Sequence, residues 1–300
     1  MRLISCLSLT SDVLNWIENS RHPRLLHVFD RACNLINERR EVLSIVTTEI
    51  GSGPFNLVVE NDICFSKYLD RQSSITISDN QLTFGDLIID TKNAKLWSPR
   101  PDWESLYAKR DEILDQITKL PTLAPDASAG VTNYPMRGLD TPFARSAQVY
   151  STTSLQSLIS NLSSSLANAD LSSSLTSTQK LAGLGIGLTP AGDDSLMGAI
   201  YAAWIIHPPQ IAGMLAQDIA TTAAPLTTSL SAAWLKSARK GEAGILWHNL
   251  FNALISNHDL AVQEALEKLL AIGYTSGSDA LAGFFDVLIN WKLRSQRVPP

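Results

Sequence analysis

The hydrophobic pattern changes its period part-way along the chain, and this change limits the folds that the chain can adopt. Before residue 121, short runs rich in Val, Ile and Thr alternate with turn signals such as GSGP at 51–54, a pattern typical of β-strands. From about residue 145 onward, apolar residues recur at helical spacing. We therefore predict an α+β fold, with an N-terminal β-rich meander or small barrel followed by a mainly α-helical C-terminal domain.

The N-terminal third is predicted to form an antiparallel meander or small barrel. The predicted strands are residues 41–49, 55–60, 74–78, 86–90 and 94–97. Residues 29–38 (FDRACNLINE) are predicted to form a short helix before these strands. Residues 103–120 are also predicted to be helical, because Leu106, Ile113 and Ile117 fall on one helical face.

Proline and glycine mark the predicted domain boundary. Residues 121–144 contain four prolines and two glycines, so they are predicted to be a linker or cover loop. This places a β-rich domain with flanking helices at 1–120 and a helical domain at 145–300. Helices are expected along a serine-rich stretch with Leu155, Leu158, Leu162 and Leu166 on one face, and at 191–206, 210–222, 226–240, 244–256, 260–271 and 278–293.

Composition argues against several kinds of partner. The formal net charge is −5, whereas non-specific nucleic-acid binding depends on basic patches. No stretch approaches the roughly 20 apolar residues of a membrane helix, and the first residues lack a small-x-small cleavage site. Three widely spaced cysteines form no CxxC pair, which favours reduced thiols. We expect a cytoplasmic protein that binds neither nucleic acid nor membranes.

A glycine-dense loop at 185–198, GIGLTPAGDDSLMG, stands directly before an apolar run. Thr189 is predicted to be the N-cap of the following helix, with Pro190 at its first position. Asp193 and Asp194 then fall in the first turn, where the helix dipole favours negative charge. Glycines before the helix, including Gly187, allow a tight turn or the close approach of a ligand.

The segment GYTSGSDALAG at 273–283 repeats this pattern. With one gap opposite Ala191, the matched pairs are Gly187 and Gly273, Thr189 and Thr275, Gly192 and Gly277, Asp194 and Asp279, Leu196 and Leu281, and Gly198 and Gly283. We predict a duplicated glycine-loop-to-helix device and hypothesise that both loops converge on one ligand site. The alternative is that each loop is only a helix entry, with glycines that permit close helix packing.

Residue spacing excludes several ligand classes. No GKS or GKT follows the first loop, so it is not a Walker loop, and GLGIG lacks the dinucleotide spacing. His207, His248 and His258 have no HExxH-type partners for zinc. A helix N-terminus with free N–H groups binds anions. The two adjacent aspartates either face away as caps or hold Mg²⁺, an ammonium or an amide NH₂ group, so Mg²⁺ is possible and no other cofactor is indicated.

A third segment, TTSLSAAWLKSARKGE at 227–242, is predicted to be an amphipathic helix opened by hydroxyl residues. Thr227 and Thr228 offer caps or ligand hydrogen bonds. The basic residues Lys236, Arg239 and Lys240 suit the C-terminal end of the helix dipole. Nucleophilic catalysis is not indicated, because the sequence has no GxSxG elbow and no cysteine in a Cys/His context.

The two glycine loops and the intervening TTSLSAAWLKSARKG helix resemble, in this order, segments of the AllH (YlbF-like) family. The N-terminal part is similar more loosely, through ACNL at 32–35 and the GSGP turn. The resemblance implies a subunit of oxamate carbamoyltransferase, in allantoin and purine catabolism. That enzyme interconverts oxalurate and phosphate with oxamate and carbamoyl phosphate. The resemblance also implies FdrA-like (AllF) and AllG-like partner subunits.

Carbamoyl transfer from a phosphate needs positioned N–H donors and an oriented substrate rather than a covalent intermediate. We predict catalytic roles for Asp193, Asp194 and Thr189. The residues predicted to bind substrate or phosphate are Gly187, Gly192, Thr275, Ser276, Gly277, Asp279, Thr227, Thr228 and Ser231. A non-catalytic scaffold or regulatory ligand-binding subunit of the same complex is the alternative.

Overall fold

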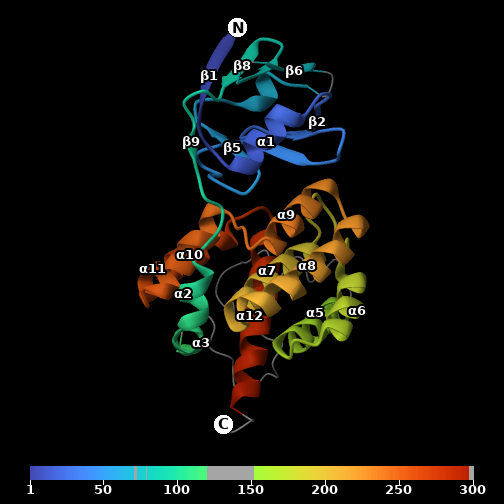
Figure 1. Cartoon of the computed structure of the whole chain (residues 1–300), viewed down its shortest axis with the longest axis vertical. Helices are drawn as coiled ribbons and strands as arrows, with labels where there is room; N and C mark the ends of the chain where they lie inside the picture. Colours follow the sequence, from blue (N-terminus) through green and yellow to red (C-terminus); the bar gives the residue numbers. More distant parts are fainter. Residues whose placement is uncertain (71–72, 79, 120–151, 297–300) are drawn as a thin grey trace. The chain divides into compact units, whose positions relative to one another are not determined.

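The computed structural model describes residues 1–70, 73–78, 80–119 and 152–296, which form two compact units (Figure 1). The first unit consists of Met1–Pro99 with Glu242–Ile245, and the second of Arg100–Gly241 with Leu246–Pro300. The predicted boundary near residue 120 is therefore too late, because residues 100–119 belong to the helical unit. The predicted linker at 121–144 lies outside the described residues.

The first unit is built around one curved sheet with a helix packed against it. Its elements are β1 (Arg2–Leu9), α1 (Ser11–Asn19), β2 (Arg24–Val28), β3 (Ala32–Ile36), β4 (Val42–Thr47), β5 (Asn56–Val59), η1 (Phe65–Lys67), β6 (Ile75–Ser78), β7 (Gln81–Phe84), β8 (Leu87–Asp90) and β9 (Lys95–Leu96). The strand order β2-β3-β4-β5-β1-β8-β7-β6, with β9 on β1, gives a nearly closed barrel. The predicted β-rich N-terminal part is confirmed.

Strand β1 joins the two halves of this sheet. Its first residues, from Arg2 to Ser5, pair in parallel with β8, and its later residues pair with β5 and β9. Strands β2, β3 and β4, and strands β6, β7 and β8, form antiparallel meanders. The pairs β4/β5, β1/β8 and β1/β9 are parallel, so the sheet is mixed rather than purely antiparallel.

The helix predicted at 29–38 is wrong, because these residues contain strand β3 between β2 and β4. Cys33 and Leu35 are fully buried, and Asn34 accepts a hydrogen bond from the Ser44 hydroxyl of β4 at 2.6 Å. A strand that is buried on both faces has no alternating pattern, so periodicity cannot distinguish it from a short buried helix. The sequence also gave no prediction for β1, α1, β2 and β7.

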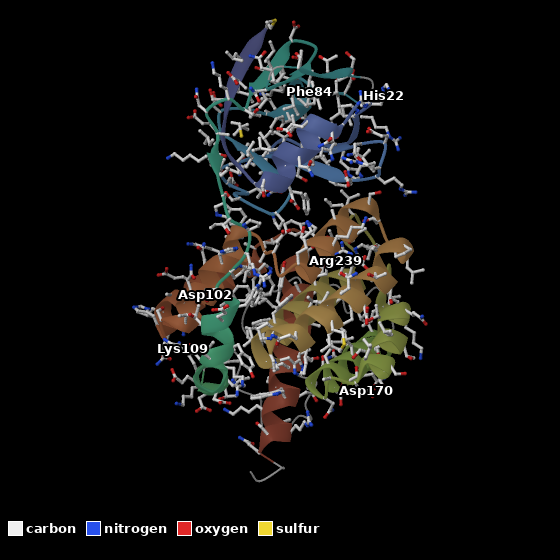
Figure 2. The ribbon with its side chains drawn as sticks, viewed as in Figure 1. His22, Phe84, Asp102, Lys109, Asp170 and Arg239 are labelled. Atoms are coloured by element: carbon white, nitrogen blue, oxygen red, sulfur yellow. The ribbon has the colours of Figure 1, made fainter. Side chains whose placement is uncertain are left out.

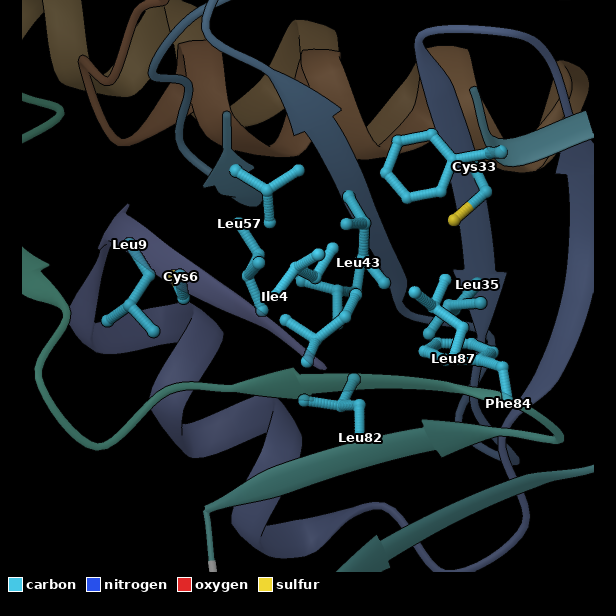
Figure 3. Close-up of a cluster of buried hydrophobic side chains, with 14 of the residues drawn as sticks. Ile4, Cys6, Leu9, Cys33, Leu35, Leu43, Leu57, Leu82, Phe84 and Leu87 are labelled. Atoms are coloured by element: carbon cyan, nitrogen blue, oxygen red, sulfur yellow. The ribbon is translucent and has the colours of Figure 1, made fainter. Parts of the chain in front are cut away.

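One hydrophobic core fills the first unit (Figure 3). Leu43 of β4, Leu57 of β5 and Leu82 of β7 are fully buried in it, and α1 adds Val13 and Trp16. Two cysteines are part of this core, and burial raises the pKa of the Cys6 thiol to about 12. These cysteines are therefore packing residues rather than nucleophiles.

The second unit is helical. Its elements are α2 (Trp103–Ala108), α3 (Arg110–Lys119), α5 (Thr152–Ala167), α6 (Leu171–Leu181), α7 (Ala191–Ile206), α8 (Pro209–Ala223), η2 (Ala224–Leu226), α9 (Ser229–Arg239), α10 (Ile245–Ile255), α11 (Asp259–Leu270) and α12 (Ser276–Ser295). The helices predicted from 191 onward are confirmed. The helix predicted at 103–120 is interrupted at Lys109, and α6 was not predicted because LSSSLTSTQKL has few apolar residues.

Helix α7 forms the centre of the helical unit, and α12 packs along it. Every residue of α7 except Met197 is buried. From Leu196 onward the helix is apolar on all sides, as expected for a buried helix. An aromatic cluster surrounds its second half, with members Trp103, Tyr201, Trp204, Trp247, Phe251 and Phe284. Trp103 donates its indole N–H to the Gly241 carbonyl at 2.7 Å. These contacts explain why α2 belongs to the helical unit.

Two helices at the surface of this unit begin with aspartate N-caps (Figure 2). Asp102 accepts a hydrogen bond from the Ser105 N–H at 3.0 Å, and Asp170 accepts one from the Ser173 N–H at 3.1 Å. Each bond satisfies a backbone donor at the start of its helix. Asp170 thereby begins α6, the helix that leads into the first glycine loop.

Candidate functional site

The first glycine loop, residues 182–190, leads from α6 into α7. Gly183 and Gly185 have φ of +71° and +134°, which L side chains rarely adopt. A Cβ at Gly183 would overlap the Leu226 carbonyl, and one at Gly185 would lie 2.5 Å from the Ala191 nitrogen. Both glycines are therefore required by the close path of the loop. At Gly187, a Cβ would meet nothing within 4 Å, and it is the φ of +96° that favours glycine there.

Thr189 is not the N-cap of α7, contrary to the prediction. Pro190 occupies that position and makes no side-chain cap hydrogen bond. The Thr189 hydroxyl instead lies 2.8 Å from the hydroxyl of Ser276, the first residue of α12. The Ser195 hydroxyl also donates to the Asp279 carbonyl at 3.1 Å. The two glycine loops therefore converge, as hypothesised, although the sequence did not single out Ser195.

The two helix entries share a pattern of backbone hydrogen bonds. In the first matched pair, the Gly192 N–H donates to the Leu184 carbonyl (2.8 Å) and the Gly277 N–H donates to the Ile272 carbonyl (3.2 Å). In the second pair, the Asp194 N–H donates to the Pro190 carbonyl (3.1 Å) and the Asp279 N–H donates to the Thr275 carbonyl (2.9 Å). Pro190 is thus the structural counterpart of Thr275, and both are N-caps. The two helices therefore align without a gap from Pro190 and Thr275 onward. The first loop is longer, because Leu184 lies eight residues before Gly192 whereas Ile272 lies five residues before Gly277, so the gap belongs in the loop and not opposite Ala191.

Four of the matched glycines permit close packing. A Cβ added at Gly198 would overlap the Ala280 carbonyl of α12, and one at Gly283 would overlap the Ser195 carbonyl of α7. Gly192 and Gly277 likewise pack against the carbonyls of Leu181 and Leu269, at the ends of the preceding helices. Because the N–H groups of Gly192 and Gly277 are bonded within their loops, their observed roles are structural.

Asp193 of α7 forms hydrogen bonds with the first glycine loop and with the residue that follows η2. The Gly183 N–H donates to its Oδ1 at 2.9 Å, and the Thr227 hydroxyl donates to its Oδ2 in a short hydrogen bond. Burial raises the pKa of Asp193, while these donors and the nearby Ser231 hydroxyl oppose the rise. The Ser231 hydroxyl itself is buried and makes no hydrogen bond of ordinary geometry within the described residues. Both oxygens of Asp193 are thus used within the protein.

Thr228 joins the third predicted segment to the first loop. Its hydroxyl donates to the Leu188 carbonyl at 2.6 Å and accepts from the Ser231 N–H at 3.1 Å, as the N-cap of α9. The predicted capping role of Thr228 is confirmed. The structure therefore places the start of α9 beside the starts of α7 and α12, and the three segments singled out in the sequence meet at one place.

Asp194 and Asp279 differ from Asp193. Their residues are only 6 % and 5 % exposed, and Oδ2 of each has no hydrogen-bond partner in the part of the chain that the structure describes. Burial raises the pKa of Asp194 well above its ordinary value, and the charge of Asp279 adds to this effect. The hydroxyls of Ser276 and Thr189 act in the opposite direction. Each carboxylate lies at a helix N-terminus, which favours its charge.

Two buried carboxyl oxygens without a partner among the described residues are stabilised by protonation, which their raised pKa values favour, or by a hydrogen-bond donor or cation of a ligand. We find no group of three or more His, Cys, Asp or Glu that could hold a metal ion among the described residues. An amide NH₂ or ammonium group has N–H donors that match carboxylate acceptors, and Mg²⁺ is commonly held by one or two carboxylates. The hydroxyls of Thr189 and Ser276 lie beside it.

Family models match both units of the chain. Residues 181–288 match the model described as oxamate carbamoyltransferase subunit AllH, and residues 5–96 match the AllH family N-terminal domain. The chain belongs to the AllH family. The 181–288 match contains all three segments of the candidate site, and the family's description makes this chain a subunit of a carbamoyltransferase complex. No solved structure matches the chain. None of the helices described in this AllH-family chain is long and apolar enough to cross a membrane.

The buried carboxylates give the helical unit an unusual pH dependence. Burial raises the pKa of Asp279 to about 6, while the Thr275 hydroxyl acts in the opposite direction. Because the folded state binds this proton more tightly than the unfolded state, the free energy of unfolding falls as pH rises from about 4 to about 6. Asp279→Asn is expected to stabilise the chain at pH 8 by on the order of 1–3 kcal/mol and to have little effect at pH 4. Urea unfolding at the two pH values measures this.

Asp170→Asn is the matched control for this experiment. The Ser173 hydroxyl and N–H lower the pKa of Asp170, so its contribution is present above about pH 4 and is lost as pH falls through the folded pKa. Asp170→Asn should therefore be less stable than the unmodified chain at pH 8, the opposite sign to Asp279→Asn. A loss of stability at pH 8 for both variants would contradict the pH dependence assigned to Asp279.

Proposed function

We propose that this chain supplies a substrate site of the carbamoyltransferase, at the place where the starts of α7, α9 and α12 meet. The observation that carries the proposal is the pair of buried carboxylate oxygens, Oδ2 of Asp194 and Oδ2 of Asp279, without a partner among the described residues. Oxamate, oxalurate and carbamoyl phosphate all contain a primary amide NH₂ group. The carboxylates would accept its hydrogens.

The surrounding residues would orient the ligand. The hydroxyls of Thr189, Thr275 and Ser276 lie at the two helix entries and can donate to or accept from it. The open backbone at Gly187 offers an approach to the first loop. Thr227 and Thr228 would not contact the ligand themselves. They would hold Asp193 and Leu188 in place through their hydrogen bonds. In this proposal Asp194 and Asp279 contact the substrate, and Asp193 positions the loop.

The reaction requires proton transfer but no covalent enzyme intermediate. In the direction of oxalurate cleavage, a phosphate oxygen attacks the terminal carbamoyl carbon and the bond from that carbon to the inner nitrogen breaks. The inner nitrogen takes up a proton and leaves as the amide of oxamate. A carboxyl group with a pKa of about 6 is suited to deliver a proton near neutral pH. Asp279 is our candidate for this role.

The test uses the complex formed with the expected FdrA-like (AllF) and AllG-like subunits. Phosphate-dependent oxalurate cleavage is measured in the presence of oxamate or of oxalate, which has a similar size but lacks the NH₂ group. Oxamate should inhibit at least about tenfold more strongly than oxalate, because a carboxylate facing carboxylates leaves charges unpaired. Equal inhibition by the two anions would count against amide recognition by Asp194 and Asp279. If oxamate inhibits the complexes carrying Asp194→Asn or Asp279→Asn as strongly as it inhibits the unmodified complex, a scaffold or regulatory role for this chain is favoured.

A further inference from the structure

The two glycine loops each carry a large apolar side chain in solvent, and a third precedes the segment 227–242. Ile186, Tyr274 and Leu226 are 72 %, 62 % and 51 % exposed, and we call these three residues the apolar rim. Ile186 lies three residues before Thr189, and Tyr274 lies two residues before Ser276. The hydroxyls of Thr189 and Ser276 are hydrogen-bonded to each other. The backbone of Leu226 lies against Gly183. Each rim residue therefore lies within three residues in the chain of a hydroxyl residue of the site, and Leu226 directly precedes Thr227.

Such a grouping is not explained by the fold. Single exposed apolar residues are common on protein surfaces, but a group of them bordering one buried polar site indicates an interaction surface. Aromatic and large aliphatic residues are typical of the buried centre of interfaces. None of the three side chains is needed for the close contacts of the loops, which are made by glycine and by the backbone.

The charge of the site supplies a second, independent observation. The charged groups that act on the pKa of Asp194 are Asp279 and Asp193, which both raise it. No lysine or arginine of the described residues is among the groups with the largest effects on the pKa of Asp193, Asp194 or Asp279. The proposed ligands, however, are anions with a carboxylate or phosphate group. Binding an anion beside two carboxylates requires a positive charge that this part of the chain does not supply.

We infer that another subunit of the transferase docks on the apolar rim and completes the site with an arginine or lysine. This inference rests on the proposed function for its ligand. The partner surface would be apolar where it covers Ile186, Tyr274 and Leu226, with its cation directed at the anionic end of the substrate. An arginine suits this role, because its planar guanidinium binds carboxylate and phosphate groups in a bidentate manner. The active site would then lie between subunits.

The first experiment measures assembly. The chain is co-expressed with its partner subunits as the unmodified form, as Ile186→Ser/Tyr274→Ser, and as the control Leu260→Ser. Leu260 is 66 % exposed but lies in α11, outside the three segments. The rim variant should weaken assembly at least about tenfold by native mass spectrometry or analytical ultracentrifugation, while Leu260→Ser should assemble normally. The melting temperatures of the isolated variants show whether the chain remains folded.

The outcomes separate this inference from the proposed function. Normal assembly of the folded rim variant would overturn the docking surface. A dimer of the isolated chain that the rim variant disrupts would also overturn it, because a second copy of this chain would then cover the apolar rim. Oxamate should bind the complex at least about tenfold more tightly than the isolated chain. Equal binding would overturn the shared cation. Asp194→Asn, which leaves the rim unchanged, should assemble normally, so a defect in its turnover tests only the proposed function.

Discussion

Replacing Asp194 by asparagine is expected to lower kcat/KM of the assembled transferase by at least about 100-fold while the helical unit stays folded. The variant keeps the size of the side chain and an oxygen that can accept from the Ser276 and Thr189 hydroxyls, which act on Asp194. It places an NH₂ donor where Oδ2 now has no partner among the described residues. Two donors would then face each other at the substrate amide, an arrangement that removes a hydrogen bond and adds a clash of like dipoles.

The measurement is phosphate-dependent oxalurate cleavage by the co-expressed complex, with circular dichroism of the variant as the check on folding. Asp259→Asn is the matched control. Asp259 is an exposed carboxylate of the same unit whose Oδ1 accepts from Gln116 at 2.8 Å, and asparagine can keep that bond. The control should retain full activity. Near-normal turnover by the Asp194→Asn complex would refute the substrate site.

The double variant Asp194→Asn/Asp279→Asn adds information on coupling. The charge of Asp279 acts on the pKa of Asp194, so the two carboxylates belong to one titrating pair. If they bind the same amide group, their effects on activity are not additive, and the double variant should lose little more than Asp194→Asn alone. Additive losses would indicate two separate binding events.

Replacing Gly198 or Gly283 by alanine is expected to destabilise the helical unit by at least about 3 kcal/mol. A Cβ at Gly198 would lie closer than 3.0 Å to the Ala280 carbonyl, and one at Gly283 closer than 3.0 Å to the Ser195 carbonyl. The overlapping atoms belong to the backbone of the facing helix, so no side-chain rotation relieves the overlap. The axes of α7 and α12 would have to move apart, which disturbs the core of the unit.

Gly213→Ala is the matched control for helical glycine. A Cβ there would lie 3.4 Å from Cη2 of Trp204, an ordinary contact, and alanine is favoured over glycine in a helix by about 1 kcal/mol. Gly213→Ala should therefore be neutral or stabilising, whereas Gly198→Ala should lower the midpoint of urea unfolding. A Gly198→Ala variant as stable as the unmodified chain would show that the contact between α7 and α12 is looser than described.

Local sequence pattern predicted the helices from residue 191 onward because their apolar residues repeat at helical spacing over many turns. It also located strands β4, β5, β6 and β8 and the short strand β9. The failures have physical causes. Strand β3 is buried on both faces, and α6 has too few apolar residues for a clear period. Parallel pairing of β1 with β8 depends on residues far apart in the chain, which no local pattern records.

The sequence by itself determined that two glycine loops are related, because both copies carry the same glycines and the same aspartate before an apolar helix. Only the tertiary structure decided which carboxylate oxygens lack a hydrogen-bond partner among the described residues. Asp193 and Asp194 are neighbours in the chain, but successive residues point about 100° apart around a helix. Asp193 is therefore directed at Gly183 and Thr227, while Asp194 is directed at the second loop and Asp279. Asp193 is a structural residue and Asp194 is a candidate ligand-binding residue because different elements pack on the two sides of α7.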